Sequence, residues 1–418
     1  MAQRIDHLAA IISTACNTIA GDLDQNNLPH PSFDAEGPLT LNLSPQAEHA
    51  RSTAVDTLQE LLDLLQGPVV CMLPKYNATS LQVISRRDIA LKVPIQGSIS
   101  LSDLAEATDL DVTNLKRIMR YAMSFHRLFI EPEEGFIAHS AGSKKLATDD
   151  FARAGLAQSM DDFYRAFART ADALDSFKDS EPNHTGYALA HATDKSMFDF
   201  LGSKPSKASQ FSKAMCFFSA GIPEYSETSL VESYDWGSLG TGTVVDVGGA
   251  DGYVSRALSK AYPLLEFIVE DLPEVVANAK LLPGAANCAR VRYQDYDFFS
   301  PQPIHAADIY LFRWVFHDWP DHYVVKILRA QIPALRPGAR ILVNESLSPP
   351  YRALPLTLQR SVCHIDSIMM ATSNSRLRSV AEWQSIFRDA DPRFQTVRRL
   401  SVAEGDALAI LEVMWMGE

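Results

Sequence analysis

The chain has 418 residues, a net charge of −13 and 46% hydrophobic residues. This length is more than one hydrophobic core usually serves, so it predicts two domains, and the composition excludes an intrinsically disordered chain. The negative charge disfavours nucleic acid as a partner, because an acidic surface repels phosphate, and it favours a small molecule.

Membrane and metal sites are not expected either. No apolar run in the sequence approaches the roughly 18 residues that a membrane span needs. The five cysteines are scattered and lack Cys-x-x-Cys or Cys/His metal spacing. We therefore predict no metal site, no membrane partner and a reducing compartment, the cytoplasm.

The N-terminal half, residues 1–230, is predicted to be a helical domain. Residues 1–25 and 50–68 repeat apolar positions at spacings of three and four, and Gly67-Pro68 is predicted to end the second helix. These helices offer more amphipathic surface than one small core can bury. We therefore expect the domain to form a homodimer.

A segment from about residue 95 to 140 has the pattern of a winged helix. It reads as helix, turn, helix and then two short strands around 131–135. DNA recognition and protein packing both use this pattern. The strands carry Glu131, Glu133 and Glu134, and the whole chain is acidic, so we favour a packing or dimerisation role.

Residues 231–418 change to an alternation of strands and helices. Short apolar runs alternating with crossover helices predict an α/β domain with a parallel sheet covered on both faces. Two further strands in 393–415, joined by a turn at 404–406, predict an antiparallel hairpin at the sheet edge. The parallel strands are expected within 242–249, 265–273, 289–299, 307–316 and 338–350.

Ligands of such sheets bind at the carboxyl ends of the strands, where this chain places polar residues in order. Gly248 and Gly249 directly follow the first strand, in a sequence that does not fit the GxGxxG dinucleotide fingerprint. Asp271 ends the second strand, at the position where a carboxylate accepts ribose hydroxyls. Asp297 and Phe298 follow the third and suit an amino-bearing ring. The pattern indicates a nucleoside cofactor without a pyrophosphate.

Six segments resemble those of the S-adenosylmethionine-dependent O-methyltransferases of plant and fungal secondary metabolism, most closely the fungal ones. They are VVDVGGADGYVSRAL, FIVEDLPEVV, YDFF, LFRWVFHDWPD, ILVNE and HIDSIMMA. The resemblance spans nearly the whole chain. It implies a Rossmann-like class I methyltransferase domain at 231–418, a helical dimerisation domain at 1–230 and S-adenosylmethionine as cofactor. It also implies cofactor contacts at Gly248, Gly249, Asp271, Leu272, Asp297, Phe298 and Arg313.

The resemblance assigns catalysis to the stretch that follows the fourth strand. The family's histidine in this motif takes a proton from the acceptor hydroxyl, so His317 is implied as the general base, a role that suits imidazole. Asp318 is expected to cap the next helix or to contact substrate. Glu345, at the end of the next strand, is implied as the carboxylate that orients the imidazole.

The family places a second glutamate in the segment that reads SRLRSVAEW here, and Leu377 stands at its position. Leucine cannot orient imidazole, which leaves Asp366 or Asp318 as substitutes. Three functions stay open. They are O-methyl transfer to a small aromatic or polyketide, a pericyclase or dehydratase that uses the sulfonium only as a fixed charge, and a non-catalytic cofactor-binding dimer. The predicted substrate pocket comprises Phe163, Phe167, Asp366, Met369 and Met370.

Overall fold

The computed structural model describes residues 2–73, 77–221, 225–280, 288–400 and 407–417. The chain divides into two compact units. The first comprises Met1–Tyr164, Ser209–Phe217 and Leu354–Arg360, and the second comprises Arg165–Ala208, Phe218–Ala353 and Ser361–Glu418. This division differs from the predicted boundary at residue 230, because most of the chain between 165 and 230 makes its contacts within the second unit.

The first unit is mainly helical. Its elements are α1 (Ala2–Gln25), α2 (Pro45–Cys71), α3 (Thr79–Arg86), α4 (Ile89–Lys92), β1 (Ile99–Ser100), α5 (Leu101–Thr108), α6 (Val112–Tyr121), η1 (Ala122–His126), β2 (Ile130–Glu133), β3 (Phe136–Ala138), α7 (Ala141–Thr148), α8 (Asp150–Ala157) and η2 (Gln158–Phe163).

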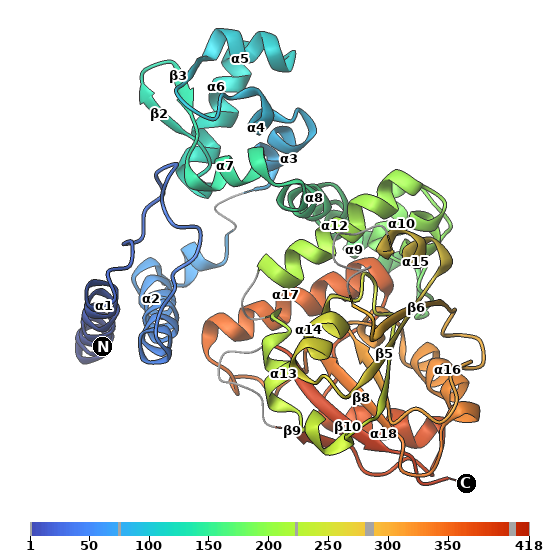
Figure 1. Ribbon diagram of the computed structural model, residues 1–418. Helices are drawn as coiled ribbons and strands as arrows, with labels where there is room; N and C mark the ends of the chain where they lie inside the picture. The colour runs from blue at the N-terminus through green and yellow to red at the C-terminus, as the bar shows by residue number, and fades with distance from the viewer. Residues whose placement is uncertain (1, 74–76, 222–224, 281–287, 401–406, 418) are drawn as a thin grey trace. The chain divides into compact units, whose positions relative to one another are not determined.

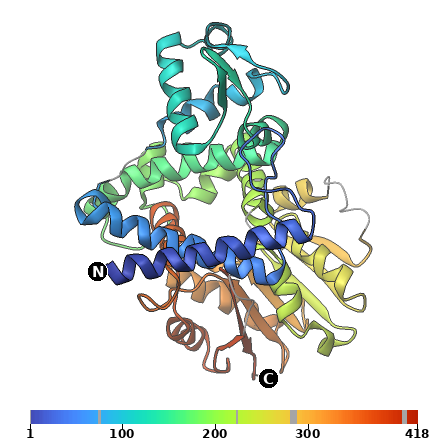
Figure 2. The ribbon, with the colours of Figure 1, turned by 90° about the vertical axis from the view of Figure 1, so that its left-hand side faces the viewer.

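Helices α1 and α2 lie side by side (Figure 1 and Figure 2). Arg4 Nη2 lies 2.6 Å from Glu60 Oε1 and pairs the two helices. The predicted stop at Gly67-Pro68 is a kink instead. Gly67 has φ 75° and ψ 168°, and the helix resumes as far as Cys71. Glycine permits this left-handed φ, and proline suits the start of the new turn.

The helix–turn–helix and its hairpin are present as expected from the sequence. The side chains of Ser100 and Asp111 cap the N-termini of α5 and α6. β2 and β3 pair antiparallel, and β1 completes a three-stranded sheet in the order β1-β3-β2. Leu104, Leu115 and Met119 have no exposed surface and centre the unit's core.

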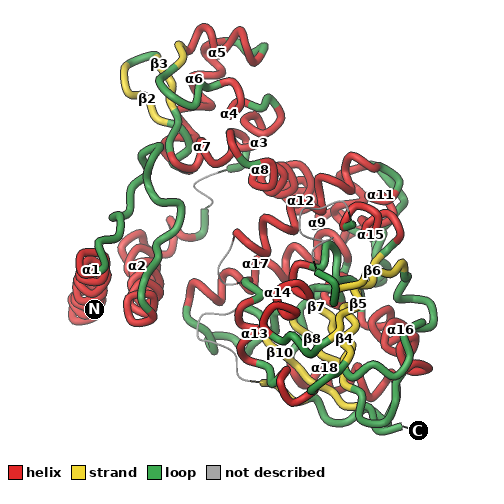
Figure 3. Tube along the Cα trace, viewed as in Figure 1, coloured by secondary structure: helices red, strands yellow, loops and turns green. Residues whose placement is uncertain are grey.

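The second unit contains a seven-stranded sheet with helices around it (Figure 3). Its helices are α9 (Tyr164–Ser176), α10 (Gly186–His191), α11 (Met197–Gly202), α12 (Pro205–Gly221), α13 (Thr228–Ser233), η4 (Trp236–Leu239), α14 (Tyr253–Ala261), α15 (Pro273–Ala279), η5 (Phe316–Asp318), α16 (Asp321–Gln331), η6 (Ile332–Ala334), α17 (Leu356–Ser373) and α18 (Val380–Ala390). Parts of α12 and α17 belong to the first unit.

The sheet has the order β6-β5-β4-β7-β8-β10-β9. Its strands are β4 (Thr243–Val247), β5 (Glu266–Asp271), β6 (Val291–Asp295), β7 (Ile309–Arg313), β8 (Arg340–Glu345), β9 (Arg398–Leu400) and β10 (Ala409–Met414). The first five are parallel, as predicted, and β10 is antiparallel to β8 and β9. The hairpin prediction is confirmed for its strands, whereas its turn at 404–406 lies outside the described residues.

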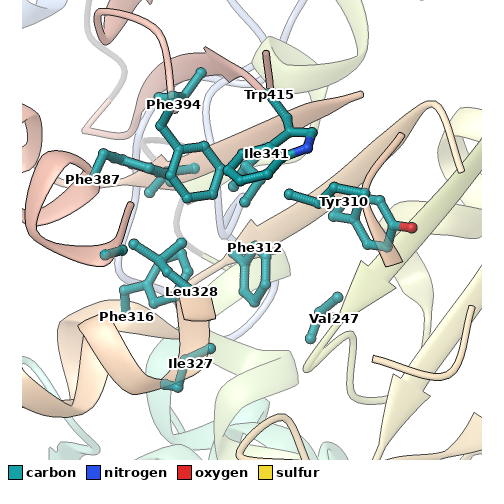
Figure 4. Packing of buried hydrophobic residues seen from close by; sticks show 14 of the residues in the cluster. Val247, Tyr310, Phe312, Phe316, Ile327, Leu328, Ile341, Phe387, Phe394 and Trp415 are labelled. Carbon is teal, nitrogen blue, oxygen red and sulfur yellow. The ribbon is translucent and has the colours of Figure 1, made fainter. Parts of the chain in front are cut away.

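Side chains that alternate along the strands form two hydrophobic cores, one on each face of the sheet. Val247, Phe312 and Ile341 pack with α16 and α18 on one face (Figure 4). Val244, Leu311 and Leu342 pack with α13 and α14 on the other. A sheet buried on both faces favours mainly apolar strands, which β4, β7 and β8 have over most of their length.

In the part of the chain that the structure describes, no helix is both long and apolar enough to cross a membrane. The same residues contain no group of three or more His, Cys, Asp or Glu side chains that could hold a metal ion. All five cysteines are free thiols.

Candidate active site

Five neighbouring strands end at one edge of the sheet, and each delivers a residue that the sequence singled out. Along the order β6, β5, β4, β7, β8 these are Asp297, Asp271, Gly248, Arg313 and Glu345. The chain changes direction across the sheet between β4 and β7, because β5 and β6 lie on one side and β7 and β8 on the other. Open α/β sheets bind ligands at such a switch point.

The loop after β4 is tied to the neighbouring strand by its backbone. The amides of Gly248 and Gly249 donate to the carbonyl of Glu270, at 2.8 and 3.1 Å. A Cβ on Gly249 would lie 2.7 Å from Asp246 Cγ, so no side chain fits there. Ala250 follows with a positive φ of 51°. The loop therefore passes closely over the sheet and presents backbone to a ligand.

Asp271 holds the same loop with one carboxylate oxygen and fixes the start of its own following turn with the other. Oδ2 accepts the amide N–H of Ala250 at 2.9 Å, and Oδ1 accepts that of Leu272 at 2.8 Å. Burial raises the pKa of Asp271 to about 6. Each oxygen keeps a further lone pair, so the carboxylate retains the capacity to accept two hydroxyl groups.

Phe298 forms an apolar wall beside the glycine loop. A Cβ on Gly248 would lie 3.9 Å from Phe298 Cε1. The ring also packs edge-on against Phe299 and Trp319, with centroid distances of 5.1 and 6.0 Å. Asp297 Oδ1 accepts the amide of Phe299 at 3.0 Å, which fixes the turn that carries the ring.

Arg313 is buried and its guanidinium is bound to protein groups. It donates to Asn344 Oδ1, to the carbonyl of Tyr225 and to the hydroxyl of Tyr253. It also lies 5.5 Å from the ring of Trp314, which has a positive φ of 54°. The sequence indicated neither Trp314 strain nor these partners, since they depend on which elements meet at this edge.

His317 is carried by η5, the short turn after β7, and is 8% exposed. Burial and the nearby charge of Arg378 lower the pKa of its imidazole to about 3. Its Nδ1 is enclosed and has no hydrogen-bond partner among the described residues. Nε2 lies 3.8 Å from Asp318 Oδ1, which is beyond hydrogen-bond distance.

Glu345 contacts the turn of His317 through its backbone. Oε1 accepts the amide N–H of Val315 at 3.2 Å and that of His317 at 3.1 Å. The expected contact between this carboxylate and the imidazole ring is not found among the described hydrogen bonds. Burial raises the pKa of Glu345 to about 7, and burial followed by the charge of Glu345 raises the pKa of Asp318 well above its usual value.

The segment with Leu377 lies in the same unit. Leu377 is 3% exposed, and its amide donates to Asp366 Oδ1 at 2.7 Å. Asp366 therefore fixes the backbone at Leu377, as Glu345 fixes the backbone at His317. The next residue, Arg378, is fully buried and binds the carbonyls of Phe316 and Trp319, at 3.0 and 2.6 Å.

Sequence reasoning missed Arg378 as a site residue, although it borders Leu377 in the segment SRLRS. Its carbonyl contacts bracket His317 and Asp318 in the chain, and it lies 2.7 Å from Asp321 Oδ1 through Nε. The sequence offers little signal for it, because Arg376 in the same segment is also an arginine and is exposed.

The predicted substrate residues are divided between the units. Phe163 ends η2 in the first unit, whereas Phe167, Asp366, Met369 and Met370 belong to the second. Phe167 lies on α9 and its ring contacts that of His364 on α17 in a tilted arrangement, with ring centroids 5.7 Å apart. Met369 is buried and Met370 is 40% exposed. The structure thus brings α9 and α17 together at one aromatic contact.

Comparison with known proteins decides the family. The model of the O-methyltransferase domain matches residues 171–392. A grayanic acid biosynthesis cluster O-methyltransferase of Cladonia grayi is 43% identical over 425 residues, covering 100% of this chain and 89% of the relative. The chain belongs to the O-methyltransferase family.

Solved structures agree on the fold. OxaC in complex with sinefungin and meleagrin is 22% identical, with a TM-score of 0.75, and the match covers 97% of this chain and 99% of OxaC. A protein described as a pericyclic reaction enzyme is 19% identical, with a TM-score of 0.71 over 97% and 99% of the two chains. The O-methyltransferase fold therefore serves more than one reaction among its structural neighbours.

S-adenosylmethionine is the cofactor of this O-methyltransferase family member. The residues present fit it, because the closely packed glycine loop, the carboxylate of Asp271 and the wall of Phe298 suit a nucleoside without a pyrophosphate. When bound, the cofactor supplies an electrophilic methyl group on a positively charged sulfur. Asp271 would hold its ribose and Phe298 would pack against its adenine.

Proposed function

We propose that this O-methyltransferase methylates a hydroxyl group of a small aromatic or polyketide secondary metabolite. The observation that carries the proposal is the position of His317. It is buried on the turn that follows β7, next to the strand ends that suit the cofactor. The Cladonia grayi relative is named after a biosynthesis cluster, which supports a secondary metabolite as the acceptor.

In this proposal the protein accelerates the reaction mainly by positioning the acceptor oxygen, and strong acid–base catalysis is not required. Glu345 and Arg378 hold the backbone of η5 from two sides, so His317 meets the acceptor oxygen in one place. His317 either forms a hydrogen bond with that oxygen or takes its proton. Alignment of oxygen, methyl carbon and sulfur then accounts for most of the acceleration.

A second function has an observation in its favour. Nδ1 of His317 has no partner among the described residues, and Leu377 stands where the family resemblance implies a catalytic glutamate. A pericyclase or dehydratase would need no such carboxylate, because the sulfonium would act only as a fixed positive charge. The structural likeness to a pericyclic reaction enzyme concerns the fold alone.

Mass spectrometry with methyl-labelled cofactor separates the two functions. Methyl transfer yields labelled product and one S-adenosylhomocysteine per turnover. Product that forms without label, while the cofactor stays intact, would reject methyl transfer in favour of the pericyclase. A panel of fungal phenols and polyketides is the natural set of acceptors.

We also propose that the protein is a cytoplasmic homodimer that assembles through its N-terminal helices. Val55, Leu58, Leu62 and Leu65 recur on one face of α2 and are 41–65% exposed. Such a stripe on a helix that already packs against α1 indicates a surface for another chain. A second copy of this chain is the occupant we propose.

A further inference from the structure

Glu345 and Asp366, two carboxylates considered as partners of the His317 imidazole, bind backbone amides instead. Glu345 accepts the amides of Val315 and His317, and Asp366 accepts the amide of Leu377. Neither is bound to the imidazole in the described hydrogen bonds, and Nδ1 is enclosed without a partner. A general base of this type relies on a carboxylate at Nδ1 to select the tautomer and to stabilise the imidazolium.

The charged groups around His317 come from three elements and one loop. Asp318 lies on the same turn, Glu345 on β8, Asp321 on α16, and Arg378 precedes α18. Burial favours the neutral forms of Asp318 and Glu345, whereas Asp321 is paired with Arg378 at 2.7 Å. Burial disfavours a positively charged imidazole, and the charge of the fully buried Arg378 guanidinium adds to this effect.

The free Nδ1 changes what His317 can offer to a ligand. A carboxylate at Nδ1 would force the proton onto that nitrogen and leave Nε2 as an acceptor for a hydroxyl proton. Without one, the tautomer with the proton on Nε2 is available. Nε2–H then donates a hydrogen bond, which suits an oxygen that has already lost its proton.

We propose that the acceptor is an acidic phenol or enol that binds as its anion, with His317 as the hydrogen-bond donor to the anionic oxygen. This inference rests on the proposed methyl transfer and adds the class of acceptor. The acceptor loses its proton to water before the reaction. Its oxygen then forms the bond to the methyl carbon, the carbon–sulfur bond breaks with its electron pair going to sulfur, and no proton moves in this step.

The test uses the full-length protein saturated with S-adenosylhomocysteine, with 4-nitrophenol as the probe. At a pH below that at which free 4-nitrophenol ionises, the bound probe should show phenolate absorption, with its ionisation shifted in favour of the anion by about tenfold. His317→Phe, which has no donor, should lose this shift. His322→Phe is the matched control, because His322 lies on α16, is exposed and should leave the shift unchanged.

Turnover supplies the second readout. With S-adenosylmethionine, kcat/KM near neutral pH should be at least about tenfold higher for 4-nitrophenol than for 4-methylphenol, and it should rise with pH as the acceptor ionises. Leu377→Glu should reduce the difference in kcat/KM between the two phenols, because it restores the glutamate that the family resemblance places at this position to orient the imidazole as a base.

Each result bears on a different claim. Binding of 4-nitrophenol as the neutral phenol, or equal turnover of both phenols, would overturn the anionic acceptor while methyl transfer stands. Anion binding with no label transferred from the cofactor would reject the proposed function but keep the anion site. Failure of every phenol tested to bind would overturn the acceptor class itself.

Discussion

Glu345 holds His317 by its backbone, with the carboxylate Oε1 3.1 Å from the amide nitrogen. The same oxygen accepts the amide of Val315, so one buried carboxyl group fixes the turn between β7 and α16. A glutamate that the resemblance assigned to the imidazole thus stabilises the conformation of the loop that carries it.

This contact predicts a contrast between two substitutions at Glu345. Glu345→Gln keeps a carbonyl oxygen for both amides and should melt within a few degrees of the unmodified protein. Glu345→Ala leaves two buried N–H groups without a partner and should lose about 2–4 kcal/mol of stability. Thermal melting measures both. Equal melting temperatures for the two variants would contradict the backbone role.

Arg378 is predicted to stabilise the same turn from the other side. Arg378→Met removes bonds to two carbonyls and to Asp321, and should cost about 2–4 kcal/mol in urea unfolding and lower kcat. Arg376→Met is the control, because Arg376 also pairs with Asp321, at 2.8 Å, but is half-exposed. It should change stability by less than about 0.5 kcal/mol.

Asp271 is predicted to contribute to cofactor affinity. Asp271→Ala should weaken the binding of S-adenosylhomocysteine by about 1.5–3 kcal/mol, because it removes charged hydrogen bonds and loosens the loop at Ala250. Calorimetry measures the affinity, with Glu266→Ala at the exposed start of β5 as the control. Unchanged affinity in Asp271→Ala would place the ribose elsewhere.

Glu270 should make stability depend on pH. It has no exposed surface, one oxygen accepts Gln302 Nε2 at 2.9 Å, and burial raises its pKa from 4.5 to about 7. The folded state therefore binds more protons than the unfolded state between these values, and stability falls as pH rises from 4.5 through 7.

The corresponding substitution is Glu270→Gln, which cannot ionise. It should raise the melting temperature by a few degrees at pH 8, corresponding to about 1–3 kcal/mol, and by much less at pH 4.5. Glu266→Gln, at the exposed start of the same strand, controls for the loss of a surface charge. A gain that is the same at both pH values would exclude ionisation of Glu270 as its cause.

The exposed stripe on α2 predicts the oligomeric state. Leu62→Glu with Leu65→Glu places two charges within a surface that a second copy would bury, and light scattering should report a halved mass. Leu264→Glu alters a similarly exposed leucine in the second unit and should leave the mass unchanged. An unmodified protein that is already monomeric would refute the dimer.

The residues of the cofactor edge were predictable because they depend on local pattern. The central strands follow short, mainly apolar runs, and parallel strands end at one edge of the sheet, so Gly248, Asp271 and Asp297 were expected at the same edge. The glycine loop, the family and the cofactor follow from segments of a few residues. These features need no knowledge of which distant groups meet.

Only the tertiary structure decided what each charged group contacts. Glu345 and His317 are 28 residues apart, and whether the carboxylate meets the ring or the amide depends on the twist between β7 and β8 and on the shape of η5. The burial of Arg378 and its bonds to the carbonyls of Phe316 and Trp319 likewise join groups that are far apart in the sequence. Hydrogen bonds are short-ranged and directional, so a sequence pattern that brings groups to one edge leaves their partners undetermined.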